Sequence, residues 1–86
     1  MAHILLAEDD ASMRQFLTAA LERVGHKVTP CEDGLHALKE AEDNSDDIDL
    51  LLADIVMPGI DGIELSQRIA DLNSDIKVVF ITGFSG

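Results

Sequence analysis

Three carboxylate residues follow short apolar segments of this sequence, in a pattern that suits metal and phosphoryl chemistry. Glu8 and Asp9 come directly after residues 3–7, and Asp54 comes directly after residues 48–53. If both segments are parallel strands of one sheet, the carboxylates meet at the edge where open α/β folds keep their sites. Carboxylates at short range repel one another, and a hard cation such as Mg²⁺ relieves that repulsion.

Asp54 is then a candidate nucleophile for phosphoryl transfer. A bound cation draws in a phosphoryl group and shields its negative charge, so that the Asp54 carboxylate can attack phosphorus and form an aspartyl phosphate. Catalysis of this transfer rests on positioning and on contacts to the equatorial oxygens. The cation is expected to make one contact, the hydroxyl of Thr82 another, and main-chain N–H groups after Asp54 the rest.

The segments around these residues alternate between strands and helices. Short apolar runs predict four strands, at residues 4–7, 27–31, 48–53 and 77–82. Apolar side chains at helical spacing predict three helices between them, and Met13 and Phe16 of the first helix are expected in the core. The charged segment 42–47 is expected to be a surface loop. This alternation predicts a parallel sheet with right-handed crossovers.

Local signals indicate the helix ends and the strand order. Asp10 or Ser12 is expected to cap the first helix, and Asp61 is expected to cap the third. Pro30 cannot donate a ladder hydrogen bond, so the strand at residues 27–31 is expected at a sheet edge. The order 2-1-3-4 satisfies this condition. It also brings strands 1 and 3 together where the connections reverse direction, at the carboxylate cluster.

The composition of the 86 residues argues against several classes of protein. The formal net charge of −11 disfavours nucleic-acid binding, which needs Lys and Arg against phosphate. No apolar run is long enough for a membrane span or a signal peptide, so a cytoplasmic location is expected. Cys31 stands alone and is expected to be a small apolar residue. His3, His26 and His36 lack metal-ligand spacing and are expected at or near the surface.

Taken together, these motifs resemble those of the receiver domains of two-component response regulators, the CheY-like family. The matching residues are the acid pair Glu8 and Asp9, the phosphorylated aspartate Asp54, the loop residues Met57, Pro58, Asp61 and Gly62, and the hydroxyl residue Thr82. The resemblance implies a doubly wound parallel sheet of flavodoxin/CheY-like type, with strand order 2-1-3-4-(5). It also implies a signalling module and not an enzyme.

The same resemblance implies a cofactor, its ligands and the partners. Mg²⁺ would be bound directly by Asp9, by Asp54 and by the main-chain carbonyl of Val56, with Glu8 acting mostly through water. Asp54 would be phosphorylated by a histidine kinase or a histidine phosphotransferase. Thr82 would hydrogen-bond the phosphoryl group and act as the switch, so that a downstream protein partner binds differently. No nucleic acid and no membrane is expected as a partner of this domain.

The sequence also resembles stand-alone receivers of the CpdR type, adaptors that steer an energy-dependent protease, which makes such a protease a candidate partner. It departs from the family at its C-terminus. The family's fifth strand, which carries a Lys that pairs with the phosphoryl group, and its last two helices are absent from residues 1–86. We therefore expect a receiver domain that is incomplete at this end, with an exposed edge strand that favours a dimer or a domain-swapped oligomer.

Three other interpretations of the residues stay open beside a phosphoacceptor. An aspartyl-nucleophile phosphatase also forms a phosphoaspartate, but it needs an acid two residues after the nucleophile, where this sequence has Val56. A flavin-binding domain needs a Ser-, Thr- or Gly-rich phosphate loop after the first strand, where Glu8, Asp9 and Asp10 would repel phosphate. A protein-interaction module without phosphorylation would use the same fold without the chemistry.

Overall fold

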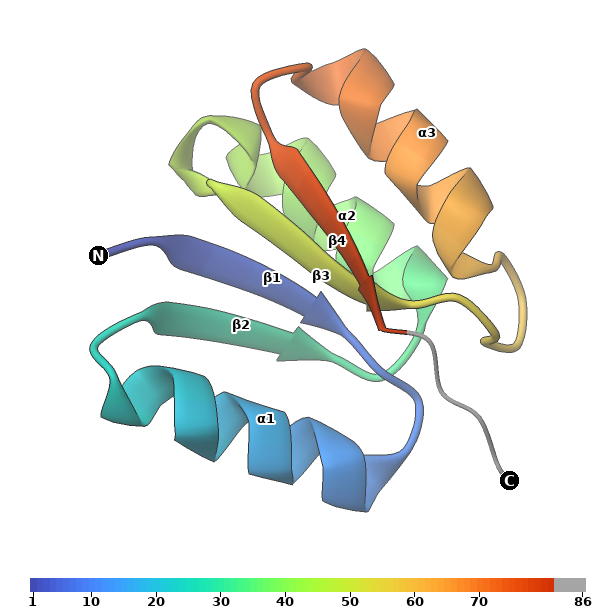
Figure 1. The fold of residues 1–86 in the computed structure, drawn as a ribbon. Coiled ribbons are helices and arrows are strands. Elements are labelled where there is room, and N and C mark those ends of the chain that lie inside the picture. The colour runs from blue at the N-terminus through green and yellow to red at the C-terminus, as the bar shows by residue number, and fades with distance from the viewer. Residues whose placement is uncertain (82–86) are drawn as a thin grey trace.

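The computed structural model of the chain describes residues 1–81 and shows a parallel sheet flanked by helices (Figure 1). The elements follow one another as β1 (His3–Ala7), α1 (Ala11–Arg23), β2 (Lys27–Cys31), α2 (Gly34–Asn44), a short 3-10 helix (Ser45–Asp47), β3 (Leu50–Asp54), α3 (Gly62–Leu72) and β4 (Lys77–Ile81). Strands and helices thus alternate as predicted, because short apolar runs alternate with segments of helical periodicity.

The strands of the described residues are parallel and lie in the predicted order β2-β1-β3-β4. β2 lies at one edge, where the missing N–H of Pro30 costs no ladder hydrogen bond. The adjacent strands β1 and β3 are in register from Ile4↔Leu50 to Ala7↔Ala53. The ladder between the two strands ends at this last pair, so Glu8, which follows Ala7, lies beside Asp54, the last residue of β3.

Helices cover the two faces of the sheet unequally. α2 and α3 lie side by side on one face, and α1 lies on the other face along β1 and β2 (Figure 1). The core between the sheet and the α2–α3 layer contains Leu5, Leu51, Leu65 and Ile69, none of which is exposed to solvent. Because successive strand residues point to opposite faces, this core takes alternate residues of β1 (Leu5 and Ala7) and of β3 (Leu51 and Ala53).

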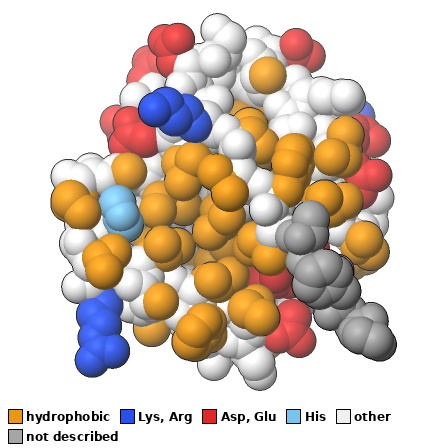
Figure 2. Space-filling view, viewed as in Figure 1, with side chains coloured by type: hydrophobic (Ala, Val, Ile, Leu, Met, Phe, Trp, Pro, Cys, Tyr) orange, Lys and Arg blue, Asp and Glu red, His pale blue; other side chains and the backbone are white. Residues whose placement is uncertain are grey.

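The α1 face differs from the prediction. The expectation that Met13 and Phe16 lie in the core is wrong, since they are 42% and 66% exposed. The reason is that α1 covers β1 and β2, while no helix within residues 1–81 covers β3 and β4 on this face. Figure 2 shows hydrophobic side chains gathered over the middle of this face.

The charged segment 42–47, predicted as a loop, is helical. α2 continues to Asn44, and Ser45–Asp47 forms a turn of 3-10 helix. The side chain of Asn73 contacts this ending, because its Nδ2 donates a hydrogen bond of 3.0 Å to the carbonyl of Ser45. The same carbonyl also accepts a hydrogen bond of 3.4 Å from the N–H of Ile48, so the amide of a distant residue adds a second donor at the end of the helix.

The ends of the strands and helices near the carboxylates are determined by nearby residues, in particular by side chains that cap the helices. β3 begins at Leu50, later than predicted, and includes Asp54 as its last residue. The caps of α1 and α3 are Asp10 and Asp61, whose side chains accept hydrogen bonds of 2.7 and 2.8 Å from main-chain N–H groups of the first turns. Of the two candidates for the first cap, the structure therefore selects Asp10. No helix in this part of the chain has the length and apolar character to cross a membrane.

Candidate functional site

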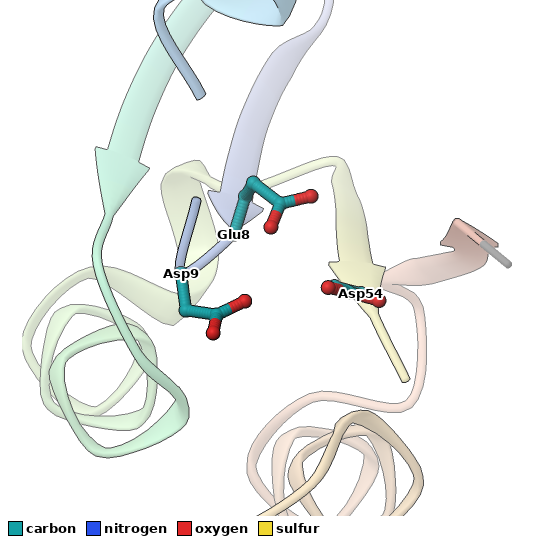
Figure 3. A group of neighbouring side chains, drawn as sticks. All are labelled: Glu8, Asp9 and Asp54. Atoms are coloured by element: carbon teal, nitrogen blue, oxygen red, sulfur yellow. The ribbon is translucent and has the colours of Figure 1, made fainter. Parts of the chain in front are cut away.

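The acidic residues singled out in the sequence meet at the carboxyl edge of the sheet. Glu8 and Asp9 follow β1, and Asp54 is the last residue of the neighbouring strand β3. One carboxylate oxygen from each of the three residues lies within 4.8 Å of the others. Figure 3 shows the three side chains directed toward the space between the ends of the two strands. The sheet register thus brings together residues that lie far apart in the sequence.

Glu8 is the buried member of the cluster, with 4% of its surface exposed. Its N–H donates to the carbonyl of Cys31 (3.1 Å), its carbonyl accepts from Nη1 of Arg14 (2.8 Å), and its Oε2 accepts from the N–H of Asp10 (3.0 Å). Burial is the main reason that the pKa of Glu8 is raised; the hydrogen bond from Asp10 opposes the shift, and the charge of Asp54 adds to it. A cation beside Glu8 would remove the repulsion.

Asp9 and Asp54 are the accessible members of the cluster. Asp9 is exposed and Asp54 is half-buried, so solvent, a cation or a phosphoryl group can reach both carboxylates. The neighbouring Asp10 does not join them, because its side chain caps α1. Mg²⁺ takes one or two protein carboxylates and keeps several waters. Two accessible carboxylates backed by a buried third one therefore fit this ion.

The loop at residues 55–61, which follows β3, is held by close main-chain packing. The N–H of Gly62 donates to the carbonyl of Ile55 (2.8 Å). A Cβ atom on Gly34 would lie 2.6 Å from Cγ1 of Ile60, closer than real Cβ contacts come. The start of α2 therefore leaves no room for the loop to shift in that direction. Both contacts hold the main chain that leaves the end of β3.

Two residues of the predicted site have no described side-chain contact in the cluster. The side chain of Val56 is 78% exposed, and the role of its main-chain carbonyl as a ligand stays a prediction. Thr82 lies outside the described residues, so its role also stays a prediction. Arg14, which contacts Glu8, is not among the site residues predicted from the sequence. A cation one helical turn after the cap Asp10, beside an acidic loop, is the signal that could have indicated it.

Cys31 and His3 supply no further nucleophile or ligand to the site. Cys31 is fully buried; burial first, and then the charges of Glu40 and Asp33, raise the pKa of its thiol to about 12. The thiol therefore stays protonated and unreactive near neutral pH. His3 lies at the start of β1, away from the cluster, and its Nε2 forms a hydrogen bond of 2.8 Å with Oγ1 of Thr29.

The sequence is similar to known signalling proteins over nearly its whole length. Residues 4–86 match the family described as "Response regulator receiver domain". The response regulator receiver protein CpdR of Brucella abortus (strain 2308) is 48% identical over 85 residues, which cover 99% of this chain and 69% of CpdR. The transcriptional regulatory protein CseB of Streptomyces avermitilis is 41% identical over 80 residues, and the match spans only 33% of CseB.

A solved relative shares the same fold. The response regulator protein TrrA of Thermotoga maritima, in complex with Mg²⁺ and BeF, superposes with a TM-score of 0.89 at 33% sequence identity, over 99% of this chain and 72% of TrrA. TrrA has also been solved in complex with the histidine kinase ThkA, and there the TM-score is 0.84 at 34% identity, over 100% of this chain and 72% of TrrA.

Proposed function

Because the chain belongs to the response regulator receiver domain family of two-component signalling, we propose that it accepts a phosphoryl group on Asp54. The observation that carries this proposal is the meeting of Glu8, Asp9 and Asp54 within 4.8 Å at the ends of β1 and β3. A histidine kinase or a histidine phosphotransferase would be the donor. The complex of TrrA with a histidine kinase supports a donor of this class.

The proposed transfer uses the half-buried carboxylate of Asp54 as the nucleophile. One carboxylate oxygen forms a P–O bond to the phosphoryl group while the P–N bond of the donor's phosphohistidine breaks, and the released imidazole takes up a proton. The main chain on either side of Asp54 is fixed, by the β3 ladder before it and by the hydrogen bond between Gly62 and Ile55 after it. Such a fixed carboxylate loses little freedom on reaction, which favours transfer.

We propose Mg²⁺ as the cofactor of this transfer. The carboxylates of Asp9 and Asp54 are accessible and would bind Mg²⁺ directly. The main-chain carbonyl of Val56 would be a third direct ligand. Glu8 is buried, with Oε2 engaged by the N–H of Asp10, which suits contact with the ion through water. When bound, Mg²⁺ neutralises charge on the phosphoryl oxygens. The Mg²⁺ complex of TrrA supports this choice of ion.

Phosphorylation would act by changing how a downstream protein binds. By resemblance to the family, the hydroxyl of Thr82 would hydrogen-bond the phosphoryl group and thereby favour one of two conformations. A ligand shifts such an equilibrium only by its difference in affinity between the two states. Similarity to CpdR makes an energy-dependent protease a candidate for the partner. The domain would thus be a switch in the cytoplasm and not an enzyme with turnover.

Exposure to acetyl phosphate with and without Mg²⁺ tests the proposal and separates it from the alternatives. A receiver takes up one phosphoryl group on Asp54, seen by intact mass, and releases inorganic phosphate slowly. An aspartyl-nucleophile phosphatase would release phosphate continuously, although Val56 occupies the position of its general acid. A module that acts without phosphorylation would show no mass increase under any condition, and that outcome would refute the proposal.

A further inference from the structure

We infer that Arg14 is a positioning residue for the Mg²⁺ site, an inference that rests on the proposed function. Arg14 lies in the second turn of α1 and is half-buried. Its Nη1 donates a hydrogen bond of 2.8 Å to the carbonyl of Glu8. This carbonyl lies just beyond the β1 ladder, whose last pairs are at Ala7. The guanidinium therefore provides a donor that the sheet does not provide.

The contacts of Arg14 enclose the turn that carries Asp9. The guanidinium binds the carbonyl of the residue before Asp9, which is Glu8, and the main-chain N–H of Arg14 binds the carbonyl of the residue after it, which is Asp10 (2.9 Å). The N–H of Asp10 in turn donates to Oε2 of Glu8. One residue of α1 thus fixes both ends of the turn whose two carboxylates face Asp54.

Arg14 donates to a main-chain carbonyl and not to a carboxylate, and this choice of acceptor determines whether the carboxylates stay free to bind a cation. Because Nη1 of Arg14 binds a neutral carbonyl, the carboxylate oxygens of Glu8 and Asp9 are not used up in an ion pair and remain available to a cation. The other five cationic residues of the chain are placed elsewhere: Arg23 ends α1, Lys27 and Lys77 begin strands, and Lys39 and Arg68 pair with acids on their own helices.

A positioning role and a purely electrostatic role of Arg14 predict opposite changes in Mg²⁺ affinity when Arg14 is replaced. If the guanidinium only adds positive charge near the carboxylates, Arg14→Gln removes repulsion and Mg²⁺ binds more tightly. If it fixes the turn, Arg14→Gln removes this hydrogen bond, because the glutamine amide ends two bonds short of the position of Nη1, and Mg²⁺ binds more weakly. Loss of a group that orients metal ligands lowers metal affinity about 10-fold or more. Arg14→Lys keeps the charge and can still donate a hydrogen bond, so it should recover part of the affinity.

Calorimetric titration with MgCl₂ at constant ionic strength tests the inference. We expect the affinities to fall in the order wild type, Arg14→Lys, Arg14→Gln. Arg23→Gln is the matched control: it removes the same charge from an exposed position on the same helix, and its affinity should be unchanged. Circular dichroism in EDTA checks that each variant is folded before Mg²⁺ is added. If Arg14→Gln does not fold, the comparison of wild type with Arg14→Lys decides the question.

The possible results separate the inference from the function on which it rests. Suppose that wild type binds Mg²⁺ and that a folded Arg14→Gln binds it equally or more tightly. The inference is then wrong and the proposed function stands. Where Arg14→Gln does not fold, the same conclusion follows if Arg14→Lys binds Mg²⁺ equally or more tightly than wild type. If wild type does not bind Mg²⁺, the proposed function is wrong and the inference falls with it.

Discussion

The main chain of Gly62 lies directly against the carbonyl group of Asp54. A Cβ atom on Gly62 would overlap the carbonyl oxygen of Asp54 and lie 3.0 Å from both the carbonyl carbon of Asp54 and Cα of Ile55. The glycine is needed here because of this close approach, since positive φ angles within the described residues occur only at Gly25 and Gly59. The main chain of the first residue of α3 thus lies in close contact with the residue that is proposed to be phosphorylated.

Gly62→Ala should destabilise the fold and slow phosphorylation of Asp54. The new methyl group meets main-chain atoms that cannot rotate away, so we expect the free energy of unfolding to fall by about 3 kcal/mol, at the upper end of overpacking costs.

Gly59→Ala is the matched control in the same loop. Gly59 has φ 79° and no atom within 4 Å of an added Cβ, so only left-handed strain of about 1 kcal/mol is expected. Thermal unfolding and acetyl phosphate labelling of both variants measure the difference. Equal losses in the two variants would contradict the steric explanation.

Asp54→Asn should abolish labelling by acetyl phosphate while the protein stays folded. The amide keeps the shape of the side chain but is not a nucleophile, and it also relieves repulsion with Glu8. Asp61→Asn is the control, because it removes the same charge nearby and asparagine still caps a helix. Intact mass after exposure to acetyl phosphate and Mg²⁺ reports both results. Labelling that persists in Asp54→Asn would place the acceptor elsewhere.

Glu8 should make the metal-free protein less stable as the pH rises. Its pKa in the folded protein is raised above the ordinary value of 4.5, mainly by burial. Between these two values the folded state holds more protons than the unfolded state, so the contribution of Glu8 to the free energy of unfolding falls as the pH rises through that window. Mg²⁺ should oppose this loss, since it stabilises the ionised carboxylate.

The difference between wild type and Glu8→Gln isolates this effect from the other carboxylates. Denaturant unfolding in EDTA at a series of pH values from 4 to 8, with exposed Glu42→Gln as the control, provides the measurement. We expect wild type to lose stability relative to Glu8→Gln as the pH rises, and the control to run parallel to wild type. A constant difference between wild type and Glu8→Gln would show that burial does not shift this pKa.

The sheet order and the meeting of the carboxylates could be predicted because both depend on local sequence. Pro30 places β2 at an edge, and acidic residues that follow apolar strands must lie at the carboxyl edge of a parallel sheet. The exposure of Phe16 could not be predicted, because it depends on which strands α1 covers. The contact of Asn73 with Ser45 depends on residues far apart in the sequence, and the contact of Arg14 with Glu8 depends on how a turn folds back. Neither contact leaves a periodic signal in the sequence.

A polypeptide of residues 1–86 alone should associate through the exposed apolar face and the edge strand β4. Phe16, on the helix that lies on this face, is 66% exposed, and Val79 of β4 is 47% exposed. Within residues 1–81, β4 pairs only with β3. Each 100 Å² of apolar surface that stays in water forgoes about 2.5 kcal/mol of stabilisation, a large share of the stability of a small domain. Size-exclusion chromatography with light scattering should therefore show dimers or larger species.

The double variant Phe16→Ser, Val79→Thr should shift the population toward monomer, whereas Val24→Ser, at the C-cap of α1, should not. A monodisperse, folded wild-type monomer would show that this face and edge are stable in water.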